Sequence, residues 1–425
     1  MTSSTAQKNA PRTSESFHLE GLLREKRVLV CVGSGGVGKT TTAAALALLA
    51  STLGRRALVI TIDPARRLAN SLGLDGLAHQ PKTLSRDLLV EGGIEPLVDV
   101  DAMMLDLQAA WDDLLQRTSP SPQMQEKLLE NRFYKHLTRD LPGAQEFIAC
   151  EALQNLLDKD VYDLIILDTP PTRNALDFLE APSRILDFLE NEAMRNFYDK
   201  LSTKVPGKGV ATRMGLRLFE GATGIVQSAI SKFTGPELLD DLGDFLGLIR
   251  DFVEPLKVRS RAFQQMLNSD AASFIVVTAP EAGPLNEALY FASELEERAF
   301  PIGGVLVNRV MPSVGMQQDH GNDDVKVQWN IGEPEEIEAL LEQGFPDADV
   351  QLAELSYSLH TAMMEQQSLA ARDKKAIQKL RAELPNGTSV LAIARQEGDV
   401  ADVSRLKLLF PDLLGKGILR RWLSE

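Results

Sequence analysis

The chain has 425 residues, of which 44% are hydrophobic and 25% charged, as in an ordinary globular protein. Its net charge of −15 argues against nucleic acid as the main partner, because a phosphate backbone would be repelled except at a local basic patch. Two cysteines, Cys31 and Cys150, exclude a disulfide framework and a C-x-x-C metal site.

Residues 1–22 are polar and begin with a stretch rich in serine and threonine. They lack the apolar core of a secretory signal peptide, and their composition is typical of a disordered tail. We therefore expect ordered structure to begin near residue 23 and the protein to be cytoplasmic.

The next segment carries the most specific signal in the chain. An apolar run at 28–32 (VLVCV) predicts a buried parallel strand, with Cys31 as a small core residue. It is followed by GSGGVGKT (33–40) and by an Ala/Leu-rich stretch at 41–53 that predicts a helix ending at Gly54. The octapeptide satisfies the phosphate-loop pattern G-x-x-x-x-G-K-[ST] in the strand–loop–helix context that this pattern requires. The sequence therefore predicts binding of a nucleoside triphosphate.

The residue types of this loop suit a triphosphate. Its glycines let the backbone turn so that N–H groups point at phosphate, and the new helix adds its positive end. Lys39 supplies a cation for the β- and γ-phosphates, and the Thr40 hydroxyl is placed to bind Mg²⁺. The predicted nucleotide-binding residues here are Gly33, Ser34, Gly35, Gly36, Val37, Gly38, Lys39, Thr40 and Thr41.

Further strand-like runs alternate with helical patterns along the rest of the chain. This alternation predicts an α/β fold with a doubly wound, mostly parallel sheet, the phosphate-loop NTPase fold. The predicted strands lie at 57–62, 164–167, 274–278 and 304–307.

About a hundred residues separate the strands at 164–167 and 274–278, too many for one crossover connection. Helical periodicity inside this gap predicts an inserted helical subdomain. The expected organisation is a disordered tail at 1–22, a nucleotide-binding domain in two parts at 23–184 and 271–425, and a helical insertion at 185–270. Helical additions at 333–384 belong to the second part.

Two aspartates follow predicted strands. Asp63 lies in TIDPARRLA (61–69) and Asp168 in LIILDTPPT (164–172). The carboxyl ends of strands form the ligand-binding edge of an open α/β sheet. We predict that Asp63 orients or deprotonates an attacking water, and that Asp168 is the acidic residue near Mg²⁺. Each aspartate alone would more simply be a turn or helix-cap residue, but both together with a complete phosphate loop favour catalysis.

Six motifs occur in the order typical of one family. They are GSGGVGKTT, TIDPARRLA, LPGAQE (141–146), DTPPT, VTAPE and GVLVNRV (304–310). They resemble the ArsA-type ATPases, which include the arsenical pump ATPase and the eukaryotic tail-anchored-protein targeting ATPase. The resemblance covers residues 28–310 and implies an ATP- and Mg²⁺-dependent homodimer whose inserted helices handle a client. It also implies that Asp63 and Asp168 lie in two switches and that Asn308 hydrogen-bonds adenine.

The chain departs from this family at Ser34, where members usually carry a lysine that reaches the partner's phosphates. A cation at the transferred phosphate can be worth about 10³–10⁵ in rate, so either another residue supplies it or hydrolysis is slow. We rank Arg66 first as the replacement because it lies one short turn after Asp63, with Arg67 and Arg173 as alternatives. The three metalloid-binding cysteines and the zinc site known in the family are absent from the sequence.

These features predict an ATPase that converts ATP to ADP and phosphate and acts as a dimeric switch for a hydrophobic or protein client. Three alternatives stay open. They are the ATPase subunit of an arsenite or antimonite efflux pump, a positioning ATPase of the cell-division or partition type, and a slow or non-catalytic nucleotide-binding scaffold.

The C-terminal segment 413–425 (LLGKGILRRWLSE) predicts a short basic amphipathic helix. Its composition suits peripheral contact with the inner face of a membrane. The alternative, which the short length and two glycines favour, is that its apolar face docks on the protein itself.

Overall fold

The computed structural model describes residues 19–62, 67–118, 122–131, 144–169, 257–314, 332–344, 351–400 and 402–417, with Glu180, Pro255 and Leu419. Its centre is an eight-stranded sheet with the strand order β3-β4-β2-β5-β1-β6-β7-β8. All neighbouring strands are parallel except β3 and β4. The predicted α/β class with a mostly parallel sheet is confirmed. The strands are β1 (Val28–Val32), β2 (Ala57–Thr61), β3 (Lys82–Thr83), β4 (Val100–Met104), β5 (Leu164–Asp168), β6 (Ala272–Thr278), β7 (Ile302–Val310) and β8 (Val390–Ala394).

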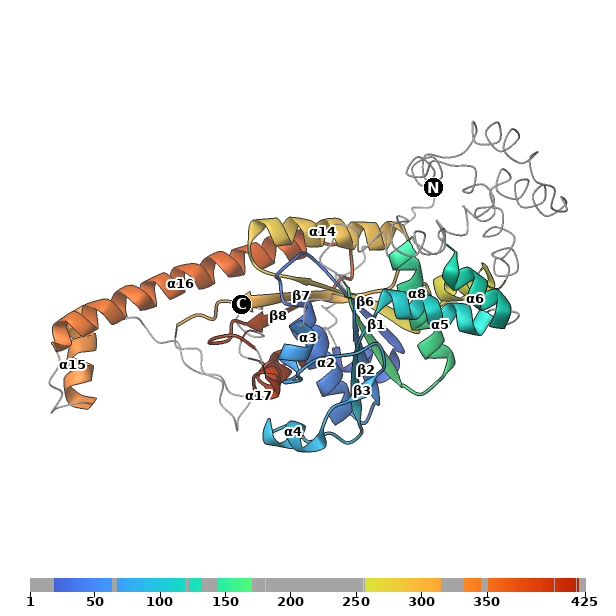
Figure 1. The fold of residues 1–425 in the computed structure, drawn as a ribbon. Helices are drawn as coiled ribbons and strands as arrows, with labels where there is room; N and C mark the ends of the chain where they lie inside the picture. The colour runs from blue at the N-terminus through green and yellow to red at the C-terminus, as the bar shows by residue number, and fades with distance from the viewer. Residues whose placement is uncertain are drawn as a thin grey trace, which may run out of the picture.

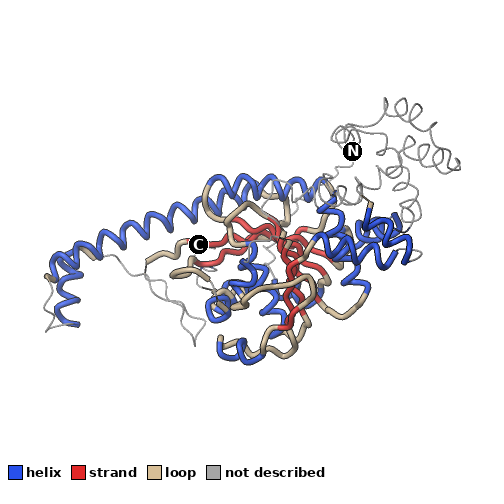
Figure 2. Tube along the Cα trace, in the orientation of Figure 1, coloured by secondary structure: helices blue, strands red, loops and turns tan. Residues whose placement is uncertain are grey.

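Helices cover both faces of this sheet, which gives three layers (Figures 1 and 2). One face packs against the first group of helices, from α1 to α4, together with α17 and α18. The other face packs against α5, α8, the helical segment 257–267, α14 and the C-terminal half of α16. The helices are α1 (Leu19–Glu25), α2 (Lys39–Thr52), α3 (Arg67–Ser71), α4 (Arg86–Glu91), α5 (Leu107–Thr118), α6 (Pro122–Glu130), α8 (Ala144–Asp158), α14 (Ala282–Glu297), α15 (Pro334–Gly344), α16 (Leu352–Glu383), α17 (Val403–Lys407) and α18 (Phe410–Leu413).

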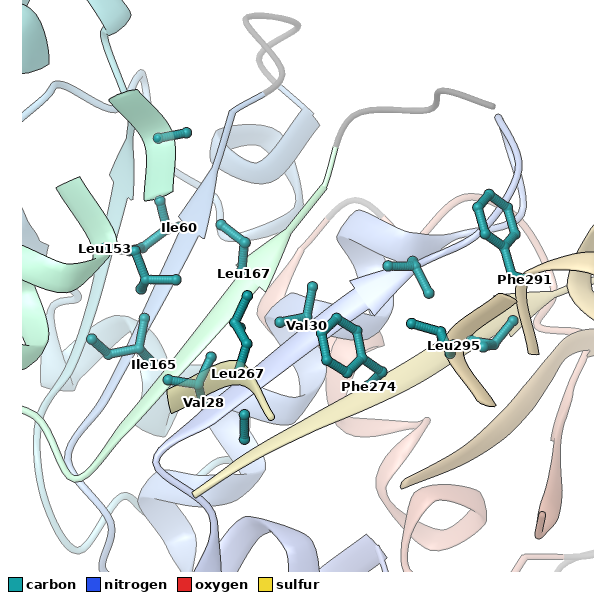
Figure 3. Close-up of a cluster of buried hydrophobic side chains, with 14 of the residues drawn as sticks. Val28, Val30, Ile60, Leu153, Ile165, Leu167, Leu267, Phe274, Phe291 and Leu295 are labelled. Atoms are coloured by element: carbon teal, nitrogen blue, oxygen red, sulfur yellow. The ribbon is translucent and has the colours of Figure 1, made fainter. Parts of the chain in front are cut away.

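The alternation of side chains along β1 divides the core between the two faces. Val28, Val30 and Val32 point to the α8 and α14 side, whereas Leu29 and Cys31 point to the α2 side. Figure 3 shows the first of these clusters, in which Val28 and Val30 meet side chains from neighbouring strands and helices. Because β1 is buried on both faces, its sequence is apolar throughout, as expected of a central parallel strand.

α2 is apolar around nearly its whole circumference, and its residues from Thr42 to Ser51 are all buried. A helix of this kind belongs inside a protein, and α2 packs between the sheet and α3 and α17. The start of α2 at Lys39 is therefore held rigidly at the carboxyl end of β1.

The first helix begins at Leu19, four residues inside the segment predicted as a tail. Leu19 and Leu23 are buried on the α2 side of the sheet, and their burial explains why the chain is helical here. Residues 1–18 lie outside the described part of the chain.

Most of the predicted insertion at 185–270 also lies outside the described residues. Its last part, 257–267, is helical, and Phe263 and Leu267 are buried in the core on the α8 and α14 side of the sheet. The segment is tied to α8 by Arg259, whose Nε donates to the Glu151 carboxylate at 2.6 and 2.8 Å. Arg117 of α5 donates to the same carboxylate at 3.3 Å. Burial raises the pKa of Glu151 and the two guanidinium groups lower it.

The predicted helical region at 333–384 consists of two helices, α15 and α16. In Figure 1 the long α16 projects away from the sheet, and α15 lies against its far end. In the described part of the chain, no helix is long and apolar enough to cross a membrane.

Candidate functional site

The predicted phosphate loop connects β1 to α2 at the carboxyl edge of the sheet. Two of its glycines are required by close approaches. Gly33 has φ of +147°, and a Cβ there would lie 2.0 Å from the Val277 carbonyl oxygen. Gly38 has φ of +96°, and a Cβ there would lie 2.2 Å from Asn308 Nδ2. The loop is therefore pressed between the ends of β6 and β7, as its sequence of small residues permits.

Lys39 is the first residue of α2, and its side chain folds back over the loop. Its Nζ donates to the carbonyl oxygens of Gly33, at 2.9 Å, and Ser34, at 2.8 Å. The side chain is only 6% exposed. These contacts hold the ammonium group inside the loop, where a cation for phosphate was predicted. The Ser34 hydroxyl oxygen is buried and makes no hydrogen bond within the described structure.

Thr40 and Asp168 meet next to this loop. Thr40 Oγ1 donates to Asp168 Oδ2 at 2.7 Å, although the two residues are 128 positions apart. Asp168 ends β5 in register with Cys31 of β1 and Thr61 of β2. The Thr61 hydroxyl donates to the same oxygen at 3.0 Å. The carboxylate is fully buried. A hydroxyl and a carboxylate are the hard oxygen donors that Mg²⁺ prefers, so these residues fit the predicted metal.

Asn308 lies near the end of β7 and contacts the phosphate loop from the other side. Its Nδ2 donates to the Val37 carbonyl oxygen at 2.9 Å, and its Oδ1 accepts the Arg309 backbone N–H at 2.9 Å. Arg309 adopts φ of +60°, which is rare for a residue with a side chain. Such conformations cluster at functional sites because the surrounding structure has to hold them.

A cavity of about 980 Å³ opens beside these residues. A volume of this order suits a nucleotide-sized ligand. Its lining includes Gly36, Gly38, Thr40, Thr41 and Asn308, so it brings the phosphate loop together with the predicted adenine-binding residue. The cations among the lining residues are Lys39, Arg67, Arg309, Arg372 and Arg395, and the acids are Glu281, Asp373 and Asp399.

The remaining predicted site residues are placed as follows. Val37 is buried in the core on the α2 side, and Gly35 is exposed at the tip of the loop. Asp63, Arg66 and Arg173 lie outside the described residues, so their roles stay predictions. Arg67 starts α3 and lines the cavity.

Several residues at the cavity were not predicted. Arg395, Gln396 and Asp399 come from the loop after β8, and Arg372 and Asp373 come from α16. The Asp373 carboxylate is buried and accepts the Met311 backbone N–H at 3.0 Å. The apolar run VLAIA at 390–394, placed between two glycine-containing turns, is the signal that could have revealed β8 and its loop.

The two cysteines are both buried and free. Cys31 lies in β1 as predicted, and burial together with the nearby Asp168 charge raises the pKa of its thiol. Burial likewise raises the pKa of Cys150. Neither thiol is therefore available at the surface as a thiolate ligand.

The described part of the C-terminal segment packs on the protein. Leu413 and Leu419 are buried, and Leu414 packs against the core. These positions agree with the docked alternative for the predicted amphipathic helix. Ile418 and residues 420–425 lie outside the described residues.

Comparison with known proteins decides the family. A family model described as anion-transporting ATPase matches residues 26–351. The chain belongs to this ATPase family.

Among the relatives of this chain is the putative arsenical pump-driving ATPase 2 of Aquifex aeolicus, 25% identical over 67% of this chain and 81% of that protein. The ATPase get3 of Aspergillus terreus is 25% identical over 76% of this chain and 85% of that protein. The ATPase ASNA1 homolog 1 of Paramecium tetraurelia is 27% identical over 66% of this chain and 73% of that protein. The resemblance expected from the motifs is therefore confirmed, and this chain is an ATP-binding ATPase of the family.

Proposed function

We propose that this chain hydrolyses ATP to ADP and phosphate with Mg²⁺ and acts as a cytoplasmic, homodimeric nucleotide switch for a hydrophobic or protein client. The observation that carries the proposal is the 2.7 Å hydrogen bond between Thr40 Oγ1 and Asp168 Oδ2, beside the buried Lys39. It joins the end of one strand to the first turn of the phosphate-loop helix, where Thr40 lines a nucleotide-sized cavity.

The residues divide the work between them. Backbone N–H groups of the loop and the N-terminus of α2 bind the phosphates, and Lys39 moves from its loop carbonyls to the γ-phosphate when ATP enters. Thr40 and Asp168 would hold Mg²⁺, which would supply positive charge to neutralise the phosphates. Asn308 reads the adenine edge, and Asp63 positions the attacking water.

Dimerisation and client binding follow from the family resemblance. The client would be handled by the helices predicted over 185–270, which lie mostly outside the described residues. The arsenite-pump alternative is less favoured because both thiols of the chain are buried. A slow nucleotide switch is favoured over a fast enzyme by Ser34, which leaves no lysine beside the first glycine of the loop.

Mg²⁺-dependent ATP turnover and nucleotide binding test this proposal in the full chain. We expect Lys39→Ala to reduce turnover at least 100-fold, by the order of magnitude of a lost transition-state charge contact. The matched control is Lys82→Ala, an exposed lysine on β3, which should leave turnover unchanged. Asp63→Asn should keep ATP affinity and lose turnover. Wild-type turnover in Lys39→Ala, or equal rates with Mg²⁺ and with a chelator, would contradict the assignment.

A further inference from the structure

The N-terminal half of α16, which we call its outer half, and the whole of α15 form a two-helix arm that stands away from the sheet (Figure 1). α16 has 32 residues and is therefore about 48 Å long. Its inner half is anchored, because Ala370, Asp373, Ile377 and Leu380 are buried at helical spacing. In the outer half only Ser356 is buried, and α15 buries no residue. We call residues 332–344 and 351–368 the arm.

The arm exposes large apolar side chains to an unusual degree. Tyr357 is 66% exposed, Leu340 61% and Met364 52%, and Leu355 and Leu359 are also exposed. Large exposed apolar residues outside the arm are scattered singly over other helices and loops of the described chain. Clustering of this kind marks an interaction surface.

The positions on α16 explain why α15 cannot cover these side chains. The least exposed positions of the outer half form one face of the helix and are Leu352, Ser356, His360, Met363 and Gln366. At about 100° per residue, Tyr357 and Met364 fall to one side of that face, and Leu355 and Leu359 fall at its opposite edge. Among the described residues no third helix covers the outer half of α16, so its flanks stay open.

The charge of the arm selects the kind of partner. Residues 332–344 and 351–368 contain seven glutamates and neither lysine nor arginine. Two such arms brought together would repel each other, and an anionic lipid surface would repel either of them. A partner with basic residues beside its apolar ones would bind both the exposed apolar side chains and the glutamates of the arm.

We propose that the arm is a docking surface for a basic amphipathic helix of another protein. The flank of α16 that carries Tyr357 and Met364, the more exposed of the two, receives the apolar face of that helix, and the glutamates of α15 and α16 face its lysines and arginines. The proposal is independent of ATP hydrolysis, since docking needs no nucleotide.

Fluorescence anisotropy with the full chain tests it. The probe is a labelled 18-residue amphipathic peptide of leucine and lysine, and the control peptide has glutamate in place of lysine. We expect the Leu/Lys peptide to bind and to weaken several-fold between 0.05 and 0.5 M salt, because charge pairs at a surface are screened. The Leu/Glu peptide should not bind.

Paired variants locate the contact. We expect Tyr357→Ser with Met364→Ser to weaken binding at least tenfold, whereas Leu355→Ser with Leu359→Ser, on the opposite side of α16, should change it less than twofold. The matched control for the lost tyrosine is Tyr290→Ser on α14, which is 52% exposed and should bind as wild type. Glu335→Lys with Glu336→Lys should also weaken binding, whereas Glu91→Lys with Glu95→Lys, away from the arm, should not. Circular dichroism establishes that each variant is folded.

Four results would overturn the proposal. They are binding that stays within twofold in the Tyr357/Met364 variant, equal binding of the Leu/Glu peptide, and self-association in sedimentation velocity that the Tyr357/Met364 variant abolishes. The fourth is binding to phosphatidylcholine–phosphatidylglycerol vesicles that the same variant abolishes, with no binding of the peptide. The last two would assign the arm to a second copy of the chain and to a membrane, respectively.

Discussion

Gly36 and Gly38 both have positive φ, +77° and +96°, yet an added methyl group would meet different surroundings at each. At Gly36 it would meet no atom within 4 Å, whereas at Gly38 it would lie 2.2 Å from Asn308 Nδ2. Gly38→Ala therefore forces the Asn308 side chain to move and to lose its 2.9 Å hydrogen bond to the Val37 carbonyl. Gly36→Ala leaves that hydrogen bond intact and serves as its matched control.

The two substitutions should differ by a predictable amount. An alanine in a left-handed conformation costs about 1–2 kcal/mol at either position. The lost hydrogen bond adds about 0.5–1.5 kcal/mol in Gly38→Ala only. We expect the free energy of unfolding to fall by about 1–2 kcal/mol for Gly36→Ala and by about 1.5–3.5 kcal/mol for Gly38→Ala. Affinity for ATP should fall more in Gly38→Ala, because Asn308 and the loop move apart.

Urea unfolding followed by circular dichroism, with titration of a fluorescent ATP analogue, measures both quantities. The double variant Gly38→Ala/Asn308→Ala removes the atom that the new methyl group meets. Relative to Asn308→Ala, adding Gly38→Ala should therefore cost no more than Gly36→Ala costs in the wild type. Equal destabilisation by the two single glycine variants, or full additivity in the double variant, would refute the proposed contact between β7 and the loop.

Three further outcomes are expected. Ser34→Lys should raise kcat at least tenfold in steady-state ATP hydrolysis, and an unchanged kcat would mean that another group already supplies the cation. Leu267→Ala should lower the free energy of unfolding by about 2–5 kcal/mol in urea, since this side chain is fully buried, whereas Val258→Ala on the exposed side of the same helix should change it by under about 0.5 kcal/mol. Burial raises the pKa of Asp412 to about 6 in the folded protein from 3.8, so its charge destabilises the fold above pH 6 and this loss is recovered as pH falls toward 4. Asp412→Asn should therefore raise the free energy of unfolding at pH 7.5 relative to wild type by about 2–3 kcal/mol, with the difference vanishing near pH 4, and parallel pH profiles would contradict this reading.

Local signals in the sequence predicted much of the fold. Apolar runs identified β1, β2, β5, β6 and β7, and the phosphate-loop pattern placed the start of α2 within two residues. Strands that broke the apolar pattern were missed. β4 contains Asp101, which is tolerated there because its carboxylate accepts from the Tyr162 hydroxyl at 2.6 Å. β3 has only two residues, both exposed.

A site residue could be predicted from the sequence where a local motif at the end of a strand specifies it. Asp168 and Thr40 were each predicted from their local motifs, and the structure brings them together. Their shared neighbour Thr61 and the carbonyl partner of Asn308 depend on pairing between distant segments, which no single-sequence pattern encodes. The contribution of α16 to the cavity was missed for the same reason, since Asp373 looks in sequence like any helical surface residue.

α16 is one unbroken helix that reaches from the nucleotide cavity to the far end of the arm. Leu369, Arg372 and Asp373 line the cavity, and Leu352 lies at the other end, about 32 Å along the helix axis from Asp373. A rigid helix of this length converts any tilt about the buried Asp373 carboxylate, which accepts the Met311 backbone N–H, into a larger displacement at its N-terminal end. By geometry alone, a tilt of about 5° at Asp373 displaces Leu352 by about 3 Å. Small adjustments around a nucleotide would thus be magnified into a shift of nearly an atomic diameter at the tip.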